Sequence, residues 1–237
     1  MIKGLKLNKN CFLIILLAAI MVIPAGSARG ATRFYLRGTG AAAAEVNPTY
    51  STSWGDTSAA APARLRLSRF VISTTSLTRT TPTDKIAKSY LCNQYVSDPI
   101  AGQTISGTIS GEAQGYTSAA VNAYSEIVVR VVSNDGSTVR GTLLAMTKGG
   151  TIYPTTTATG RAIPASTSLS SVEAQNGDRI VVEVGITREA TTPNRSVSQV
   201  FRSDSATDLT EGATAANNPW IEFSQNIIFP SQGLVEF

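Results

Sequence analysis

The stretch of this sequence with the strongest suggestion of chemistry is NGDRIVVEVGI, residues 176–186. It holds two acids, Asp178 and Glu183, and an arginine, Arg179, follows the first of them. Two carboxyl groups roughly 5–9.5 Å apart in a cleft are what glycoside hydrolysis requires. Glu126 and Glu222 are further acids in segments with strand-like patterns. These acids raise a carboxylate-dependent glycosidase as a distant alternative function.

The same letters also predict a turn followed by a β-strand. Asn176-Gly177-Asp178 is a turn sequence, in which the Asp178 side chain is expected to bond a nearby backbone amide. In the strand that follows, Arg179 and Glu183 share one face but stand about 13 Å apart, so they do not pair. The apolar residues of the opposite face are Ile180, Val182, Val184 and Ile186. We therefore expect a structural strand and assign no catalytic residue.

Residue types that are missing exclude several kinds of site. The chain has no histidine, which excludes a Ser-His-Asp or Cys-His nucleophile and a histidine-bound zinc site. Cys92 is the one cysteine beyond the N-terminal segment, so no intrachain disulfide can form there. We interpret Cys92 as a small buried hydrophobic residue, with an intermolecular disulfide as the alternative.

Aromatic residues in loop-like sequence suggest a second kind of site. Tyr50, Trp54 and Tyr153 are candidates for a platform on which a sugar ring could stack. Trp220 lies beside alternating Ile and Phe, so we expect it in the core or as a plug at the end of the fold.

Three acids in RSDSATDLTEG, residues 202–212, could bind Ca²⁺, which takes several oxygen ligands. They are Asp204, Asp208 and Glu211. Their spacing does not match an EF-hand loop, and a solvated acidic loop is the competing interpretation. No other cofactor is expected.

The N-terminus has the pattern of a secretory signal peptide. Lys3, Lys6 and Lys9 precede a run of thirteen apolar residues, and the small residues AGSA then predict cleavage after Ala28. The apolar run is shorter than the roughly 20 residues of a spanning helix. We expect a secreted bacterial protein, extracellular or at the cell surface, with no membrane span after cleavage. The net charge of +4 falls to +1 without those lysines, and the remaining basic residues are dispersed, so no nucleic-acid partner is expected.

Short alternating runs separated by turn residues fill the rest of the chain and predict an all-β fold. The clearest pair is a hairpin, in which residues 125–132 and 137–147 flank the turn Ser133-Asn134-Asp135-Gly136. We expect about eight or nine strands in a single antiparallel β-sandwich of jelly-roll type, following a cleaved signal helix. The predicted divisions are a signal peptide (1–28), an N-terminal strand with an irregular Ala/Ser/Thr/Pro-rich connection (29–63), and the sandwich domain (64–237).

An ordered series of motifs also resembles a family. The series is ATRFYLRGTG, WGDTSAAAPARL, QYVSDPIAGQTISGTI, IVVRVVSNDGSTVRGTLLA, QNGDRIVVEVGI and SDSATDLTEG with ANNPWIEFSQNIIF. It resembles uncharacterised β-sandwich proteins of phage, prophage and environmental bacteria. The resemblance implies a jelly-roll-like domain with a structural or binding role and brings no catalytic residues. The export signal departs from that family and favours a surface or extracellular role.

The leading hypothesis is therefore a non-enzymatic secreted structural or adhesive protein, self-assembling on the cell surface or in an extracellular filament. Its partners would be other copies of itself or a surface glycan. Terminal segments such as TRFYL or NIIFPSQGLVEF could add to the sheet edge of a neighbour. A carbohydrate-binding module is the alternative.

Overall fold

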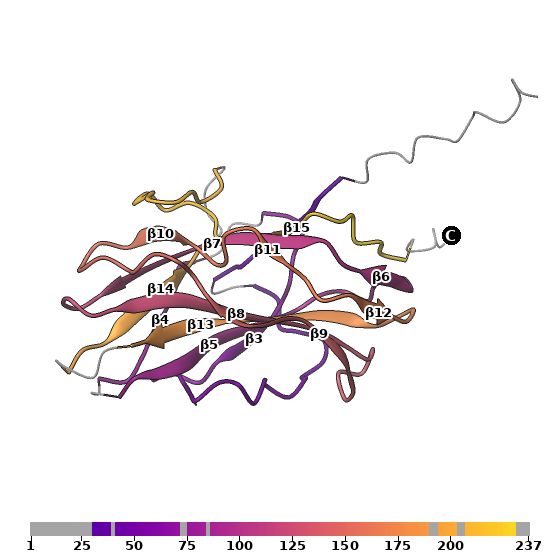
Figure 1. Ribbon diagram of the computed structural model, residues 1–237, viewed down its shortest axis with the longest axis horizontal. Coiled ribbons are helices and arrows are strands. Elements are labelled where there is room, and N and C mark those ends of the chain that lie inside the picture. Colours follow the sequence, from indigo (N-terminus) through magenta and orange to yellow (C-terminus); the bar gives the residue numbers. More distant parts are fainter. Residues whose placement is uncertain are drawn as a thin grey trace, which may run out of the picture.

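The computed structural model describes residues 30–38, 41–71, 75–83, 86–189, 194–202 and 207–230 of the 237-residue chain. These residues form fifteen β-strands and no helix (Figure 1). Nothing among them forms a helix with the length and hydropathy needed to cross a bilayer. The predicted signal peptide, residues 1–28, lies outside the described residues. The all-β fold expected after the signal segment is confirmed for the described residues.

One sheet has six strands in the order β2-β5-β13-β8-β9, with β3 also paired to β5. Its strands are β2 (Asp56–Thr57), β3 (Ala63–Arg66), β5 (Lys88–Val96), β8 (Ala123–Val132), β9 (Val139–Lys148) and β13 (Arg179–Arg188). The four long strands pair antiparallel, whereas β2 and β3 run parallel to β5. The wholly antiparallel arrangement expected from the sequence therefore needs correction at this edge.

A second sheet has seven strands in the order β1-β15-β7-β14-β4, with β10 and β11 also paired to β7. Its strands are β1 (Thr32–Tyr35), β4 (Leu77–Thr80), β7 (Thr108–Thr117), β10 (Thr159–Ala162), β11 (Thr167–Ser168), β14 (Val197–Phe201) and β15 (Trp220–Phe223). A separate pair joins β6 (Gln103–Ile105) to β12 (Val172–Ala174). The count exceeds the expected eight or nine because strands such as β2, β11 and β12 have only two or three residues, too few to show an alternating pattern.

The two large sheets face each other across one apolar core. In Figure 1, β7, β10, β11 and β15 form the upper layer and β3, β5, β8 and β13 the lower one. Alternation along each strand sends every second side chain into the space between the layers. Buried residues from the six-stranded sheet include Ile127, Val129, Val131, Ile180, Val182, Val184 and Ile186, and those from the seven-stranded sheet include Phe34, Ile109, Ala113, Val197, Phe201, Ile221 and Phe223.

The local predictions for the hairpin and for β13 are confirmed. Gly136 has a φ of 76°, and its amide donates to the Ser133 carbonyl at 2.8 Å, which closes the β8–β9 turn. Before β13, Gly177 has a φ of 93°, and Asp178 accepts a 2.8 Å hydrogen bond from the amide of Gln175. The turn and the strand face expected for residues 176–186 are therefore both present.

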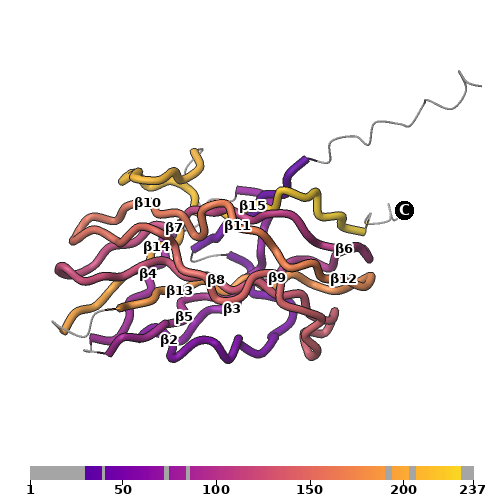
Figure 2. Tube along the Cα trace, viewed as in Figure 1, coloured from indigo at the N-terminus to yellow at the C-terminus, as the bar shows by residue number. Residues whose placement is uncertain are grey.

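The irregular connection between β1 and β3 crosses the outer face of the six-stranded sheet. Residues 45–54, called the crossing segment below, run along the lower surface in Figure 2. Ala44 and Val46 pack there against a small apolar cluster of Val96, Val132 and Val181. Over the other sheet, residues 207–218 form a covering loop, which lies above β10 in Figure 1 and buries Leu209 completely. Each outer face is thus partly covered by a segment of the same chain.

Candidate functional site

Glu183, the acid singled out by the sequence, lies at the centre of a buried polar cluster beneath the crossing segment. Its Oε1 accepts hydrogen bonds from the Arg130 guanidinium at 2.6 Å and from the Gln94 amide at 3.0 Å. Its Oε2 accepts one from the Trp54 indole at 2.8 Å. The backbone amide of Ser51 lies 3.1 Å from both oxygens. Both oxygens of this carboxylate are therefore occupied by donors from three separate parts of the chain.

The cluster is closed to solvent. The side chain of Glu183 is 0% exposed and that of Arg130 is 8% exposed. Arg130 also donates to the carbonyl of Thr49 at 2.7 Å, and Gln94 donates to that of Pro48 at 3.2 Å. A buried ion pair is tolerated when further hydrogen bonds satisfy its remaining groups, and the backbone of the crossing segment supplies two of these, although Arg130 Nε and Gln94 Oε1 are buried without a partner among the described residues. The arrangement fixes this segment onto the sheet and keeps the Glu183 carboxylate away from solvent.

Arg179 and Glu183 do not pair, as the strand geometry predicts. Arg179 bonds Glu45 at 2.8 Å and the carbonyls of Ser97 and Asn134. All these partners lie in loops at one end of the sheet. Arg179 therefore holds the start of the crossing segment, while Glu183 holds its middle.

The three strand glutamates do not share a cleft. Glu126 and Glu183 lie on the outer face of the six-stranded sheet, and the whole core separates them from Glu222 on the outer face of the other sheet. Glu126 is only 7% exposed, and burial raises the pKa of its carboxyl, with smaller lowering effects from Ser89 and Lys148. The two accessible carboxyl groups that glycoside hydrolysis needs are not brought together by these residues.

On the outer face of the seven-stranded sheet, Arg33 binds two acids, Glu222 and Asp208. Its Nε donates to Glu222 at 2.9 Å, and its Nη1 forms an ion pair with Asp208. The guanidinium lies 4.0 Å from the centre of the Trp220 ring, whose indole nitrogen donates to the Leu209 carbonyl at 2.8 Å. Trp220 is thus on the outer face, stacked under Arg33 at the covering loop. The expectation of a core position for it is corrected, since Ile221 and Phe223 take the inward positions.

The two described acids proposed as Ca²⁺ ligands, Asp208 and Glu211, have different binding partners. Asp208 pairs with Arg33, whereas Glu211 bonds Arg161 at 2.9 Å and the amide of Ala162 at 2.9 Å. Asp204 lies outside the described residues. Among the residues that the structure describes, no three His, Cys, Asp or Glu side chains are grouped as a metal site. The described carboxylates of this loop instead attach it to two different arginines.

The three aromatic residues proposed as a platform are not on one surface. Tyr153 is 2% exposed and lies between the sheets, where its hydroxyl bonds Ser125 and accepts from Gln199 at 3.2 Å. Tyr50 and Trp54 both belong to the crossing segment. The Arg64 guanidinium covers the Tyr50 ring at 4.2 Å, and the Trp54 indole is turned toward Glu183. The loop-like sequence around Tyr153 gave no indication that its ring faces inward.

Cys92 is fully buried in the core, in agreement with its interpretation as a small hydrophobic residue. Burial raises the pKa of its thiol far above the usual range, so the thiolate is not available at neutral pH.

Three arginines that the sequence analysis did not select meet at one cavity. Arg37 follows β1, Arg66 ends β3 and Arg69 lies just beyond it. They are far less conspicuous in the sequence than the acids, because isolated basic residues give no pattern. Strand pairing brings them together, since Tyr35 is bridged to Ser68 and β3 lies beside β5.

No family model matches the chain, and no curated protein matches it. Among solved structures, it is similar to a CocE/NonD family hydrolase from Staphylococcus aureus, with a TM-score of 0.46 and 9% identity over 85% of this chain and 37% of that one. An alpha-amino acid ester hydrolase gives a TM-score of 0.38 and 10% identity over 83% and 36%. The structure of infectious bursal disease virus Gt strain gives 0.29 and 10% over 64% and 35%. The chain spans about a third of the length of these proteins, and at such TM-scores the similarities carry no functional argument.

Proposed function

We propose that this chain is a non-enzymatic structural or adhesive protein of the bacterial surface or extracellular space. In this proposal its sheets form a single jelly-roll-type β-sandwich that self-associates. The observation that supports the proposal is that the conspicuous charged residues bind other parts of the same chain. Glu183, Arg130 and Arg179 bind the crossing segment, and Arg33 binds Asp208 of the covering loop, so these charges hold the chain's own segments on the outer faces of its sheets.

The edges of the sheets support self-association at one place in particular. β9 ends the six-stranded order, but its register shifts against β8 and it carries Arg140 and Lys148. Irregularities and charges of this kind protect an edge from further pairing. β4 ends the seven-stranded order with a regular register, and its one charged side chain, Arg79, is bonded to Asn93. The carbonyl of Thr80, at the end of β4, accepts a 2.8 Å hydrogen bond from the Ala59 amide, so part of this edge is paired within the chain. Of the two edges, that of β4 is still the one with a regular register and with its charged side chain bonded.

The N-terminal strand β1 is a poorer candidate for a contact between copies. TRFYL was expected to be able to join a neighbour's sheet, but β1 pairs with β15 of its own chain. Phe34 and Leu36 are 0% exposed in the core. Donation of this strand to another copy would expose both side chains, so β4 is the better candidate for the contact.

The alternative, a carbohydrate-binding module built on Tyr50, Trp54 and Tyr153, has less support, because Tyr153 lies between the sheets and the Trp54 indole is engaged with Glu183.

The test is the assembly state of the protein as a function of concentration. Thr78 is exposed on β4, and Thr78→Lys places a charge at the edge without removing a backbone donor. We expect oligomers or filaments of the wild type in sedimentation velocity and negative-stain images, and monomers of the lysine variant. Thr78→Ser is the matched control and should assemble like the wild type. A wild type that stays monomeric at all concentrations would contradict the proposal.

A further inference from the structure

The cavity where the three arginines meet has the composition of an anion site. It has a volume of about 180 Å³ and lies beside the ends of β3 and β5. Its polar and aromatic lining consists of Arg37, Arg66, Ser68, Arg69, Phe70 and Asp98. Three arginines and one carboxylate thus line a space large enough for a small polar group.

Arg37 is the least expected of these residues. It is only 4% exposed, and its Nε is buried without a hydrogen-bond partner. No carboxylate of the described residues pairs with it, although its backbone carbonyl accepts from the Tyr95 hydroxyl at 3.0 Å. Burial lowers the pKa of this guanidinium, and the charge of Arg66 lowers it further. A buried cation without a counter-charge is costly, and a bound anion would relieve that cost.

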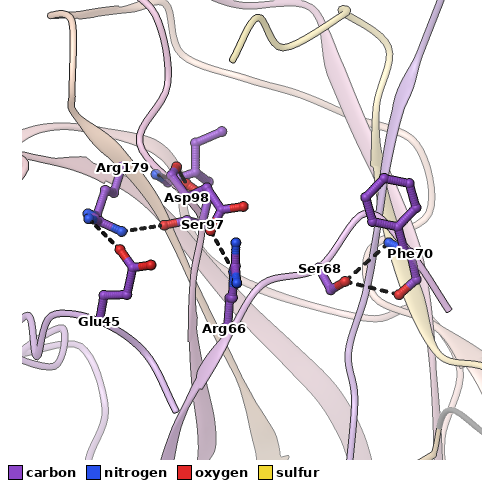
Figure 3. Close-up of polar contacts among 8 residues, drawn as sticks. Glu45, Arg66, Ser68, Phe70, Ser97, Asp98 and Arg179 are labelled. Atoms are coloured by element: carbon purple, nitrogen blue, oxygen red, sulfur yellow. Dashed lines mark hydrogen bonds and ion pairs between the residues drawn. The ribbon is translucent and has the colours of Figure 1, made fainter. Parts of the chain in front are cut away.

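The two acids near the cavity, Asp98 and Glu45, already bind arginines. Asp98 accepts a 2.6 Å hydrogen bond from Arg66, and Glu45 accepts one from Arg179 at 2.8 Å (Figure 3). Arg69 stacks 4.1 Å from the centre of the Phe229 ring and 5.7 Å from that of Phe70. Neither contact neutralises its charge. Counting the described residues alone, the cavity therefore keeps an excess of positive charge.

An apolar surface adjoins the charged one. Phe70 is 68% exposed, a large value for a phenylalanine, and Val71 beside it is 40% exposed. The Ser68 hydroxyl bonds both the amide of Phe70 at 3.1 Å and its carbonyl at 3.0 Å, which fixes the turn that presents the ring (Figure 3). A flat exposed ring beside a cationic cavity suits a ligand with an anionic group and an apolar ring face.

We propose that this cavity binds the carboxylate of an acidic sugar, a uronic acid, with the sugar ring resting on Phe70. The planar guanidinium fork matches a carboxylate with two parallel hydrogen bonds. Asp98 in the wall disfavours a doubly charged group, so a monoanion suits the site better than phosphate. This proposal does not depend on the proposed self-association through β4.

The proposal is tested by titrating the protein with glucuronate, acetate, glucose and inorganic phosphate while recording amide and arginine side-chain NMR shifts. We expect glucuronate to shift the signals of the cavity residues and to bind at least several-fold more tightly than acetate, which lacks the ring. Glucose, which lacks the charge, should cause no shift there. Phosphate that binds more tightly than both carboxylates would overturn the assignment of a carboxylate, and equal affinity for acetate and glucuronate would overturn the role of Phe70.

Variants distinguish binding in the cavity from a general effect of the net charge on glucuronate binding. Arg37→Met and Arg69→Met should each weaken glucuronate binding at least tenfold, while Phe70→Ser should weaken glucuronate binding but leave acetate binding unchanged. Lys148→Met removes one exposed positive charge at the opposite end of the six-stranded sheet and is the control. Arg69 is exposed, so its variant keeps the test valid if Arg37→Met fails to fold. Unchanged glucuronate affinity in the Arg69 variant would overturn the proposal.

Discussion

The indole nitrogen of Trp54 donates a 2.8 Å hydrogen bond to Oε2 of Glu183, across 129 positions of sequence. In the sequence these residues suggested two different functions, sugar stacking for the tryptophan and acid chemistry for the glutamate. In the fold they belong to one buried cluster. The crossing segment donates hydrogen bonds to the Glu183 carboxylate, which would otherwise be buried with fewer partners. The contact therefore explains why an irregular segment is held at a defined place on the sheet.

Breaking the ion pair inside this cluster should be strongly destabilising. Glu183→Gln leaves the buried Arg130 without its counter-charge, and we expect the free energy of unfolding to fall by about 3–5 kcal/mol in urea denaturation. Glu173→Gln, which changes an exposed acid on β12, is the control and should change stability by less than about 0.5 kcal/mol.

A double variant distinguishes the pair from its surroundings. Arg130→Met removes the stranded cation, so Glu183→Gln combined with Arg130→Met should cost less than the two single changes added together. Strict additivity of the three free energies would show that the two charges do not stabilise one another, contrary to the geometry.

Gly185 should tolerate no side chain, because the crossing segment lies directly on it. A methyl group there would stand 2.6 Å from the Trp54 ring and against the carbonyl oxygen of Tyr90. We expect Gly185→Ala to lower the free energy of unfolding by about 1–3 kcal/mol through overpacking. Limited proteolysis should also cut residues 45–54 faster in this variant. Gly150→Ala, where a methyl group would meet nothing within 4 Å, is the matched control, and equal effects of the two changes would argue against close contact at Gly185.

Local alternation made the strands and their inward faces predictable, but it gave no information on what covers the outward faces. The period of two correctly placed Ile180 and Val182 toward the core and Glu183 away from it. The donors to Glu183 come from residues 51, 54, 94 and 130, and no short-range pattern relates these positions. Long-range pairings also assembled the arginine cavity and placed Tyr153 inside. The strands and their buried faces could therefore be predicted from the sequence. The Glu183 cluster and the arginine cavity could not, because they depend on the paths of loops that no local pattern specifies.

The thiol of Cys92 should be inert in the native protein. It is 0% exposed within the core, and burial raises its pKa, so neither access nor ionisation favours reaction. We expect a thiol reagent to leave Cys92 unmodified in buffer and to label it fully in denaturant. Non-reducing electrophoresis should then show no dimer linked through Cys92. Rapid labelling of the native protein, or a dimer that disappears with reductant, would instead favour the intermolecular disulfide.

Glu112 should make stability fall as the pH rises toward neutrality. It lies on β7 beside the covering loop, with Oε2 buried and without a hydrogen-bond partner among the described residues. Burial, and secondarily the charge of Glu211, raises the pKa of its carboxyl to about 7, against a smaller opposing effect of Arg161.

Because this pKa is raised in the folded state, the protonated acid favours folding. Its contribution is complete below the unfolded pKa of about 4.3 and is lost as the pH rises through about 7. Glu112→Gln removes this titration. At pH 8 the variant should be more stable than the wild type, by on the order of 1–2 kcal/mol after allowance for partial solvent screening, and the difference should vanish near pH 4. Urea denaturation across this range measures it, with Glu173→Gln as the exposed control. A difference that is constant with pH would show that Glu112 is ionised in the folded protein as readily as in the unfolded chain.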